Sequence, residues 1–167
     1  DRSMRNNRAI YRGLLWVKGV TLFELIIVVA IIIVMGSMVI IFSNPLGMFA
    51  RARNSERRSH LNVIINTIKE NIADTRTGVF TCVNGDIPTS TAKRMTQALG
   101  AGNYNIAPCL VPTYLTNLPF DPATTSAHYV GVTDYDTGYL VVKNASPSEI
   151  TISAPAAELG VSISITR

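Results

Sequence analysis

The chain has 167 residues, 47% of them hydrophobic, and a formal net charge of +4. This length allows one membrane segment and one modest domain. Residues 1–19 hold five of the 15 Lys/Arg and one of the 11 Asp/Glu, which leaves ten basic and ten acidic side chains in the rest. That remainder is about neutral, so its net charge gives no support to nucleic-acid binding.

A long apolar segment follows the basic first residues. Residues 25–42 contain no charged side chain and are mostly Ile, Val, Leu and Met. As an α-helix with a rise of ~1.5 Å per residue, the segment would be ~27 Å long, close to the thickness of a bilayer's hydrocarbon. It is apolar on every side, which is typical of a helix in lipid or inside a bundle. A lone strand could not satisfy its backbone in lipid, so a helix is predicted.

Glu24 lies just inside the front edge of the apolar segment, directly after Gly19-Val20-Thr21-Leu22-Phe23. A carboxylate at that depth is costly unless it is paired, protonated or able to reach the headgroups. Two readings of Glu24 stay open from the residues alone. It is either an interfacial carboxylate or a group that requires a cationic partner.

The register of Gly19, Thr21-Leu22, Glu24 and the apolar run resembles the class III signal of type IV pilins and of the pseudopilins of type II secretion systems. The resemblance implies that a prepilin peptidase cuts between Gly19 and Val20 and methylates the new terminal amine. The family usually begins its mature chain with Phe or Met, and Val20 departs from that pattern. The resemblance also implies that Glu24 pairs with the terminal amine of a neighbouring subunit during filament assembly.

The same resemblance implies the partners and the location of the chain. The expected partners are the peptidase, further copies in a helical filament, minor pseudopilins and an inner-membrane assembly platform. The chain would cross the cytoplasmic membrane once, with its head on the outer side, and would not be an enzyme. Competing hypotheses are an ordinary secretory signal, although no A-x-A pattern follows the run, and a single-span membrane-anchored binding domain unrelated to filaments.

The sequence divides into a leader at 1–19, a transmembrane and assembly helix at 20–45, an amphipathic continuation at 46–74 and a loop-rich head at 75–167. Pro45 predicts a kink or a short break. Beyond it, apolar residues recur at steps of three and four, which predicts a stripe that packs on the head. The stripe consists of Leu61, Ile64, Ile65, Ile68 and Ile72. The opposite faces are expected to carry Arg57, Arg58, Asn62, Lys69 and Glu70. The arginines at 51–58 are expected to meet lipid phosphate, acidic groups of a neighbour or only solvent.

Two cysteines, Cys82 and Cys109, lie in the head. Without a Cys-x-x-Cys motif or a nearby His pair they are a poor metal site. If the head is exported, a disulfide is favoured over two unpaired buried thiols.

The rest of the head is predicted to contain one short helix and several strands. Thr89 or Ser90 could cap a helix over residues 91–99 that ends at Gly100. Strands are expected at 129–132, 139–142, 149–153 and 161–165, with a hairpin loop at 133–138. The fold class is therefore α+β, with a long N-terminal helix packed on a three- to four-stranded antiparallel sheet, the plan of pilin subunits.

A calcium site is one reading of three aspartates in the head. Leu118–Pro122 resembles the proline-aspartate-proline segment of major pseudopilins, which bind calcium nearby. Asp134 and Asp136 have the first half of a calcium loop's spacing, and Asp121 could add oxygen. The alternative is that these are ordinary turn residues. His60 and His128 are far apart and accompany no catalytic motif, so both are expected to be structural.

Overall fold

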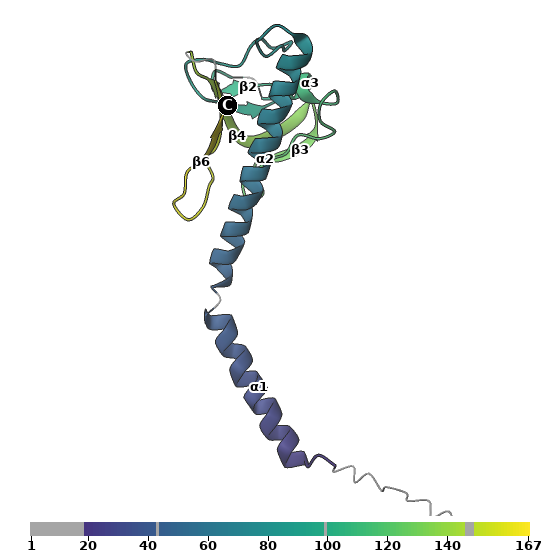
Figure 1. Ribbon diagram of the computed structural model, residues 1–167, viewed down its shortest axis with the longest axis vertical. Coiled ribbons are helices and arrows are strands. Elements are labelled where there is room, and N and C mark those ends of the chain that lie inside the picture. The colour runs from purple at the N-terminus through teal and green to yellow at the C-terminus, as the bar shows by residue number, and fades with distance from the viewer. Residues whose placement is uncertain (1–18, 43, 99, 146–148) are drawn as a thin grey trace, which may run out of the picture. The chain divides into compact units, whose positions relative to one another are not determined.

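The computed structural model describes residues 19–42, 44–98, 100–145 and 149–167. Except for Gly19, the predicted leader lies outside this range. Contacts within the chain divide it into two units, Asp1–Ser43 and Asn44–Arg167. The first unit contributes helix α1, Leu22–Phe42, and the second contains helix α2, Pro45–Thr75, with the head (Figure 1).

Helix α1 is an apolar helix with its side chains exposed. The span Leu22–Ile40 is long and apolar enough to cross a membrane, and none of it is buried by other described residues. Among the described residues it is the one helix that passes this test. By length and composition it could be a membrane anchor or a signal sequence.

Helix α2 has its own start signal. Asn44 is the N-cap, with a left-handed backbone (φ 41°), and its Oδ1 accepts a hydrogen bond from Gly47 N at 3.3 Å. Pro45 follows at the first helical position, where its missing N–H is not needed. A Cβ on Gly47 would lie 3.1 Å from Asn44 Nδ2, so glycine leaves room for the cap. Together these residues begin a new helix at Pro45.

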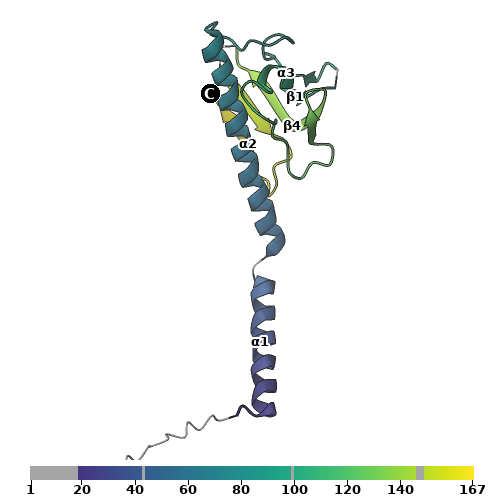
Figure 2. The same cartoon turned by 90° about the vertical axis from the view of Figure 1, so that its right-hand side faces the viewer.

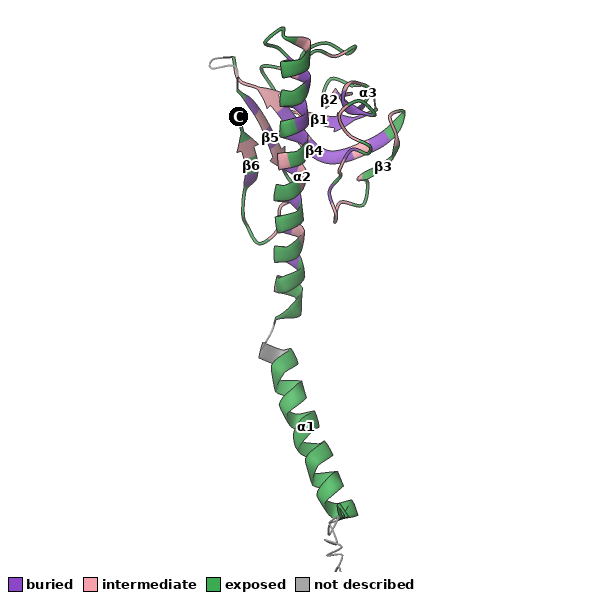
Figure 3. Cartoon of the chain, turned by 45° about the vertical axis from the view of Figure 1, so that its right-hand side comes forward, coloured by how far each residue is buried: buried purple, intermediate pink, exposed green. Residues whose placement is uncertain are grey.

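One face of α2 covers the sheet of the head (Figure 2). The stripe residues Leu61, Ile64, Ile65 and Ile68 are fully buried, and the stripe contributes to the core that the sheet completes (Figure 3). From the sheet the core takes Met95, Tyr139, Val141 and Ile152. Burying each large apolar side chain contributes roughly 1.5–3 kcal/mol, so this contact holds helix and sheet together.

The sheet has six strands in the order β2-β1-β4-β5-β6, and β3 also pairs with β4. The strands are β1 (Lys93–Thr96), β2 (Asn103–Tyr104), β3 (His128–Gly131), β4 (Asp134–Lys143), β5 (Ile150–Ala154) and β6 (Ile163–Thr166), and the short helix α3 (Ala107–Leu110) lies between β2 and β3. Strand β4 is central, because β1 pairs along one edge while β3 and β5 share the other. The β1–β2 pair is parallel and the other pairs are antiparallel.

The α+β class is confirmed, but the predicted sheet is wrong in two respects. It has six strands rather than three or four, and it is mixed rather than purely antiparallel. Part of the segment predicted as a helix over 91–99 forms β1, because Lys93 and Arg94 pair with β4 and Met95 points into the core. The predicted hairpin loop at 133–138 is also wrong, since β4 already begins at Asp134 and the turn falls at Val132-Thr133.

Candidate functional site: the start of helix α1 and the arginine cluster on the head

The start of α1 brings together the residues predicted for processing and assembly. Gly19, Val20 and Thr21 precede the helix and are exposed. Thr21 acts as its cap: Thr21 Oγ1 accepts from Glu24 N at 3.2 Å, and Thr21 O accepts from Leu25 N at 3.1 Å. Thr at the N-cap with Glu three residues later is the capping-box pattern. Thr21 therefore has a local structural role as the cap of α1.

The carboxylate of Glu24 remains available for a partner. It makes no ion pair and no side-chain hydrogen bond with the described part of the chain. A negative charge in the first turn is favoured by the helix dipole, by roughly 0.3–1 kcal/mol. That is much less than the cost of an unpaired carboxylate in hydrocarbon. The local structure of α1 therefore does not by itself compensate Glu24 at membrane depth.

The apolar surface of α1 begins directly at this carboxylate. Large side chains on all sides of the helix are roughly half exposed or more, from Leu22 and Phe23 to Val39 and Ile40. A surface of this size on a protein in water marks a site of contact with lipid or with other protein. An exposed glycine, an exposed Val20 and a carboxylate thus lie within six residues at the end of one apolar helix.

A second cluster, which we call the arginine cluster, joins α2 to two loops of the head. It consists of Arg53, Asn54, Arg57, Asp121 and Glu158. Arg57 Nε donates to Asp121 Oδ2 at 2.8 Å and Arg57 Nη2 donates to Asp121 Oδ1 at 3.0 Å, a two-bonded pair with both side chains fully buried. Arg57 Nη1 donates to Asn54 Oδ1 and to Glu158 Oε2.

The cluster favours the charged form of both carboxylates. Burial opposes ionisation of Asp121, but hydrogen bonds from Arg57 and from the backbone N–H groups of Ala123 and Thr124 outweigh it and lower the pKa of Asp121. Hydrogen bonds from Arg53 and Arg57 lower the pKa of Glu158 to about 2. The same Asp121 bond raises the pKa of Arg57 despite its burial. All three groups are therefore ionised at neutral pH.

The structure corrects the prediction for Arg57, which is buried and not on an outer face of α2. Arg53 also bonds within the chain, to Glu158, whereas Arg51 and Arg58 are exposed. A sequence signal for Arg57 existed, because it precedes Leu61 by four residues and therefore lies on the apolar stripe. The charge of Arg57 favours the surface, and that signal outweighs its spacing, which favours the core.

The three aspartates considered for calcium have other partners. Asp121 accepts from Arg57, and Asp136 Oδ1 accepts from Arg94 Nε at 2.7 Å and from Gly138 N at 2.9 Å. Asp134 lies 3.0 Å from His128 Nε2, a contact that raises the pKa of the imidazole. Across the described residues no group of three or more His, Cys, Asp or Glu side chains is placed to hold a metal ion. Calcium takes six to eight oxygen ligands, so a calcium ion that used these carboxylates would compete with the partners that they have in the structure.

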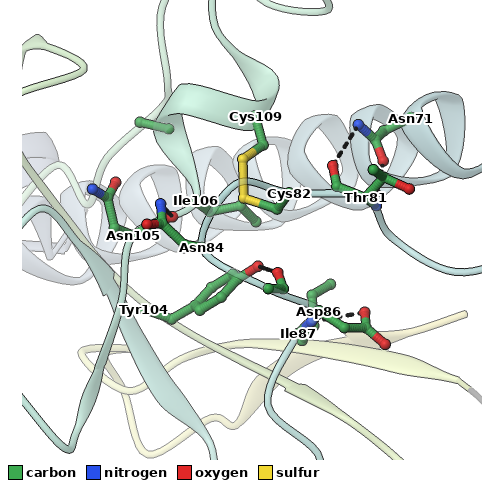
Figure 4. Close-up of a disulfide and its surroundings, with 12 residues drawn as sticks. Asn71, Thr81, Cys82, Asn84, Asp86, Ile87, Tyr104, Asn105, Ile106 and Cys109 are labelled. Carbon is green, nitrogen blue, oxygen red and sulfur yellow. Dashed lines mark hydrogen bonds between the residues drawn. A yellow bond between two sulfur atoms is a disulfide. The ribbon is translucent and has the colours of Figure 1, made fainter. Parts of the chain in front are cut away.

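Cys82 and Cys109 form a disulfide between the loop after α2 and helix α3 (Figure 4). Nearby polar bonds hold the same loop. Thr81 N donates to Asn71 Oδ1 at 2.9 Å, and Tyr104 Oη donates to Gly85 O at 2.7 Å. The disulfide closes a loop with a sequence separation of 27 residues, in a part of the head with little regular structure.

The two histidines lie in separate places. His60 Nδ1 is 2.9 Å from Tyr139 Oη, and His60 Nε2 is 3.7 Å from Glu56, at the surface of α2. His128 is at the exposed end of β3. Both therefore have local partners that account for their positions.

Comparison of the chain with protein-family models, with curated proteins and with solved structures gives no match.

Proposed function

We propose that this chain is the precursor of a structural subunit of a type IV pilus-like filament, closest in kind to the pseudopilins of type II secretion. One observation carries the proposal. Gly19, Val20, Thr21 and Glu24 stand in the register of a class III signal, directly before an exposed apolar helix long enough to span a bilayer. Helix α1 begins at Leu22, three residues after Gly19.

Cleavage would give Glu24 its partner. Hydrolysis of the Gly19–Val20 peptide bond by a prepilin peptidase leaves a carboxylate on Gly19 and an amine on Val20. The enzyme transfers a methyl group from a methyl donor to the neutral amine, and the methylated amine is protonated and positively charged at neutral pH. When α1 helices associate, the amine of an incoming subunit can approach the carboxylate of Glu24 on a neighbour. An unpaired charge in an apolar bundle is strongly destabilising, so this pairing favours one axial register over the others.

The remainder of the chain would have a mechanical role. The apolar α1 helices would form the core of the filament and the heads its surface, with minor pseudopilins and an inner-membrane platform as partners. The buried Arg57–Asp121 pair, which holds the head to α2, and the disulfide, which links two segments within the head, support this reading because both are structural contacts. We therefore assign no catalytic residue.

The proposal is tested by co-expression with a prepilin peptidase. Intact mass should fall by the mass of the first nineteen residues, and Gly19→Ala should prevent this. Gly36→Ala is the matched control: Gly36 lies within α1, where a Cβ meets nothing within 4 Å, so it should leave cleavage unchanged. An unchanged mass with an active peptidase would favour a single-span membrane-anchored domain instead.

A further inference from the structure

The first turns of α2 are apolar on several sides and exposed (Figure 3). Leu46 is 80% exposed, Met48 59% and Phe49 62%. Because an α-helix turns by roughly 100° per residue, these side chains point in widely different directions around the helix axis. One partner seated on one face could not cover all three. A surrounding apolar medium could.

The loop between β5 and β6 contacts α2 at Arg53, Asn54 and Arg57, one to two turns beyond these residues. Glu158 N donates to Asn54 Oδ1 at 3.0 Å, Asn54 Nδ2 donates back to Glu158 O at 2.8 Å, and the Glu158 carboxylate bonds Arg53. Three side chains of α2, those of Arg53, Asn54 and Arg57, thus fix the position of one loop residue. The residues that follow Glu158 therefore start from a point held against Arg53 and Asn54, about one turn beyond Phe49 on α2.

The residue that follows is Leu159, whose backbone has a φ of 62°. This left-handed conformation is unfavourable for a bulky residue and is usual for glycine or asparagine. The Leu159 side chain is nevertheless 56% exposed, and that of Val161 is 40% exposed. Neither the turn geometry nor the core explains a large apolar side chain at this position, since leucine fits the turn poorly and packs against little.

We propose that this loop tip and the start of α2 enter the boundary between lipid headgroups and acyl chains on the side of the membrane where the head lies. The inserted residues are Leu46, Met48, Phe49, Leu159 and Val161. The inference rests on the membrane-spanning part of the proposed function. Leu46 is only six residues beyond Ile40, where the candidate span ends, so at ~3.3–3.6 Å per residue the chain between them can extend no more than ~22 Å. Arg51, exposed one residue after Ala50, would reach lipid phosphate.

Spin labelling of the full chain in vesicles of phosphatidylethanolamine and phosphatidylglycerol tests this surface. Single labels are placed at Leu159→Cys, at Ile33→Cys in α1 and at Val83→Cys, an exposed site on the head. Cys82 and Cys109 are joined in the disulfide and do not take the label. For each label we measure the ratio of its collision rate with oxygen, which enters lipid, to its collision rate with a water-soluble nickel chelate. This ratio should be several-fold higher for the labels at 159 and 33 than for the label at 83.

The outcomes separate the inference from the proposed function. A label at 159 that matches the one at 83, while the label at 33 lies in lipid, overturns the inference and leaves the span intact. A label at 33 exposed to the nickel chelate removes the membrane span as well. The label at 159 could instead be protected from both reagents and show spin–spin broadening that rises with the protein-to-lipid ratio. That result would assign the surface to contact with a second copy and would also overturn the inference of lipid insertion.

A second variant guards against a folding artefact. Leu159→Asn suits the left-handed backbone, so the melting temperature of the head should stay the same or rise. With a label at Val161→Cys, the same substitution should shift the collision ratio several-fold toward the nickel chelate. An unchanged ratio in a folded protein would show that Leu159 does not hold the loop in lipid.

Discussion

Arg57 on α2 and Asp121 in a loop of the head form two hydrogen bonds, of 2.8 and 3.0 Å, across 64 residues of sequence, with neither side chain exposed. Asp121 also accepts from the N–H groups of Ala123 and Thr124, so the pair fixes that loop in shape as well as in place. Every buried side-chain N or O in the described part of the chain has a partner, which makes removal of either member costly.

Arg57→Met should therefore destabilise the head by about 3–5 kcal/mol, because it leaves the Asp121 carboxylate buried without its cation. Arg58→Met is the matched control: Arg58 is the next residue on the same helix but exposed, and should change stability by less than about 0.5 kcal/mol. Urea unfolding followed by circular dichroism measures both. Equal midpoints for the two variants would contradict the importance of the pair.

Stability should also fall in acid. Asp121 and Glu158 have pKa values in the folded chain below their ordinary values, so the stability that they contribute is complete above pH ~4–5 and is lost as the pH falls toward the folded-state values. For Glu158 that value is about 2. Unfolding curves at pH 7, 4 and 3 should show the decline, and Glu158→Gln should make it shallower. A stability independent of pH across this range would argue against ionised carboxylates in the cluster.

The disulfide should contribute more to stability than any single exposed contact. Closing a loop of sequence separation 27 restricts the unfolded chain, and the chain-entropy treatment gives about 3–4 kcal/mol. The double variant Cys82→Ser with Cys109→Ser should lower the unfolding midpoint accordingly, and reduction of the parent protein should have a similar effect. Reduction of the double variant should not lower its unfolding midpoint further, because the variant has no disulfide to break.

Glu24→Val should leave cleavage and membrane insertion intact while filament assembly fails. The reason is that the terminal amine of a neighbouring subunit loses its partner in an apolar surrounding. Glu24→Gln removes the charge with little change of shape, and Thr21→Ser keeps the capping hydroxyl as a control. The measurement is the amount of subunit in sheared filaments as a fraction of all cleaved subunit. Full assembly of Glu24→Gln would refute the pairing role.

Millimolar calcium should not shift the melting temperature of the chain. Asp121, Asp134 and Asp136 each already have a cationic or imidazole partner, and a metal would have to displace Arg57 from a buried position to recruit Asp121. A calcium-dependent rise, absent in an Asp134→Asn and Asp136→Asn double variant, would restore the calcium reading of the sequence.

The sequence predicted the elements that depend on local pattern. The uncharged run from Leu25 predicts α1, and steps of three and four from Leu61 to Ile68 predict the buried face of α2. The predicted strands at 149–153 and 161–165 agree with β5 and β6 to within about two residues, because Ile and Thr or Ser alternate along them.

Elements that depend on distant partners were not predictable in the same way. Lys93–Thr96 follows a plausible helix cap, but its pairing with β4, more than forty residues away, makes it a strand. The parallel β1–β2 pair depends on that same placement. The charge of Arg57 predicts a surface position, and the partners that allow its burial, Asp121 and Glu158, lie 64 and 101 residues further on. Tertiary contacts outweighed residue type at each of these positions.

The Asn44 cap has a consequence for how the two helices respond to change. The side chain of Asn44 caps α2 and Pro45 fixes its first helical position, so α2 can keep its start when the backbone before it melts. Unwinding at the end of α1 therefore need not continue into α2. If the chain is the filament subunit that we propose, α1 could lose turns at its end as the subunit leaves the bilayer, while the head, held to α2 by the Arg57–Asp121 pair, kept its fold.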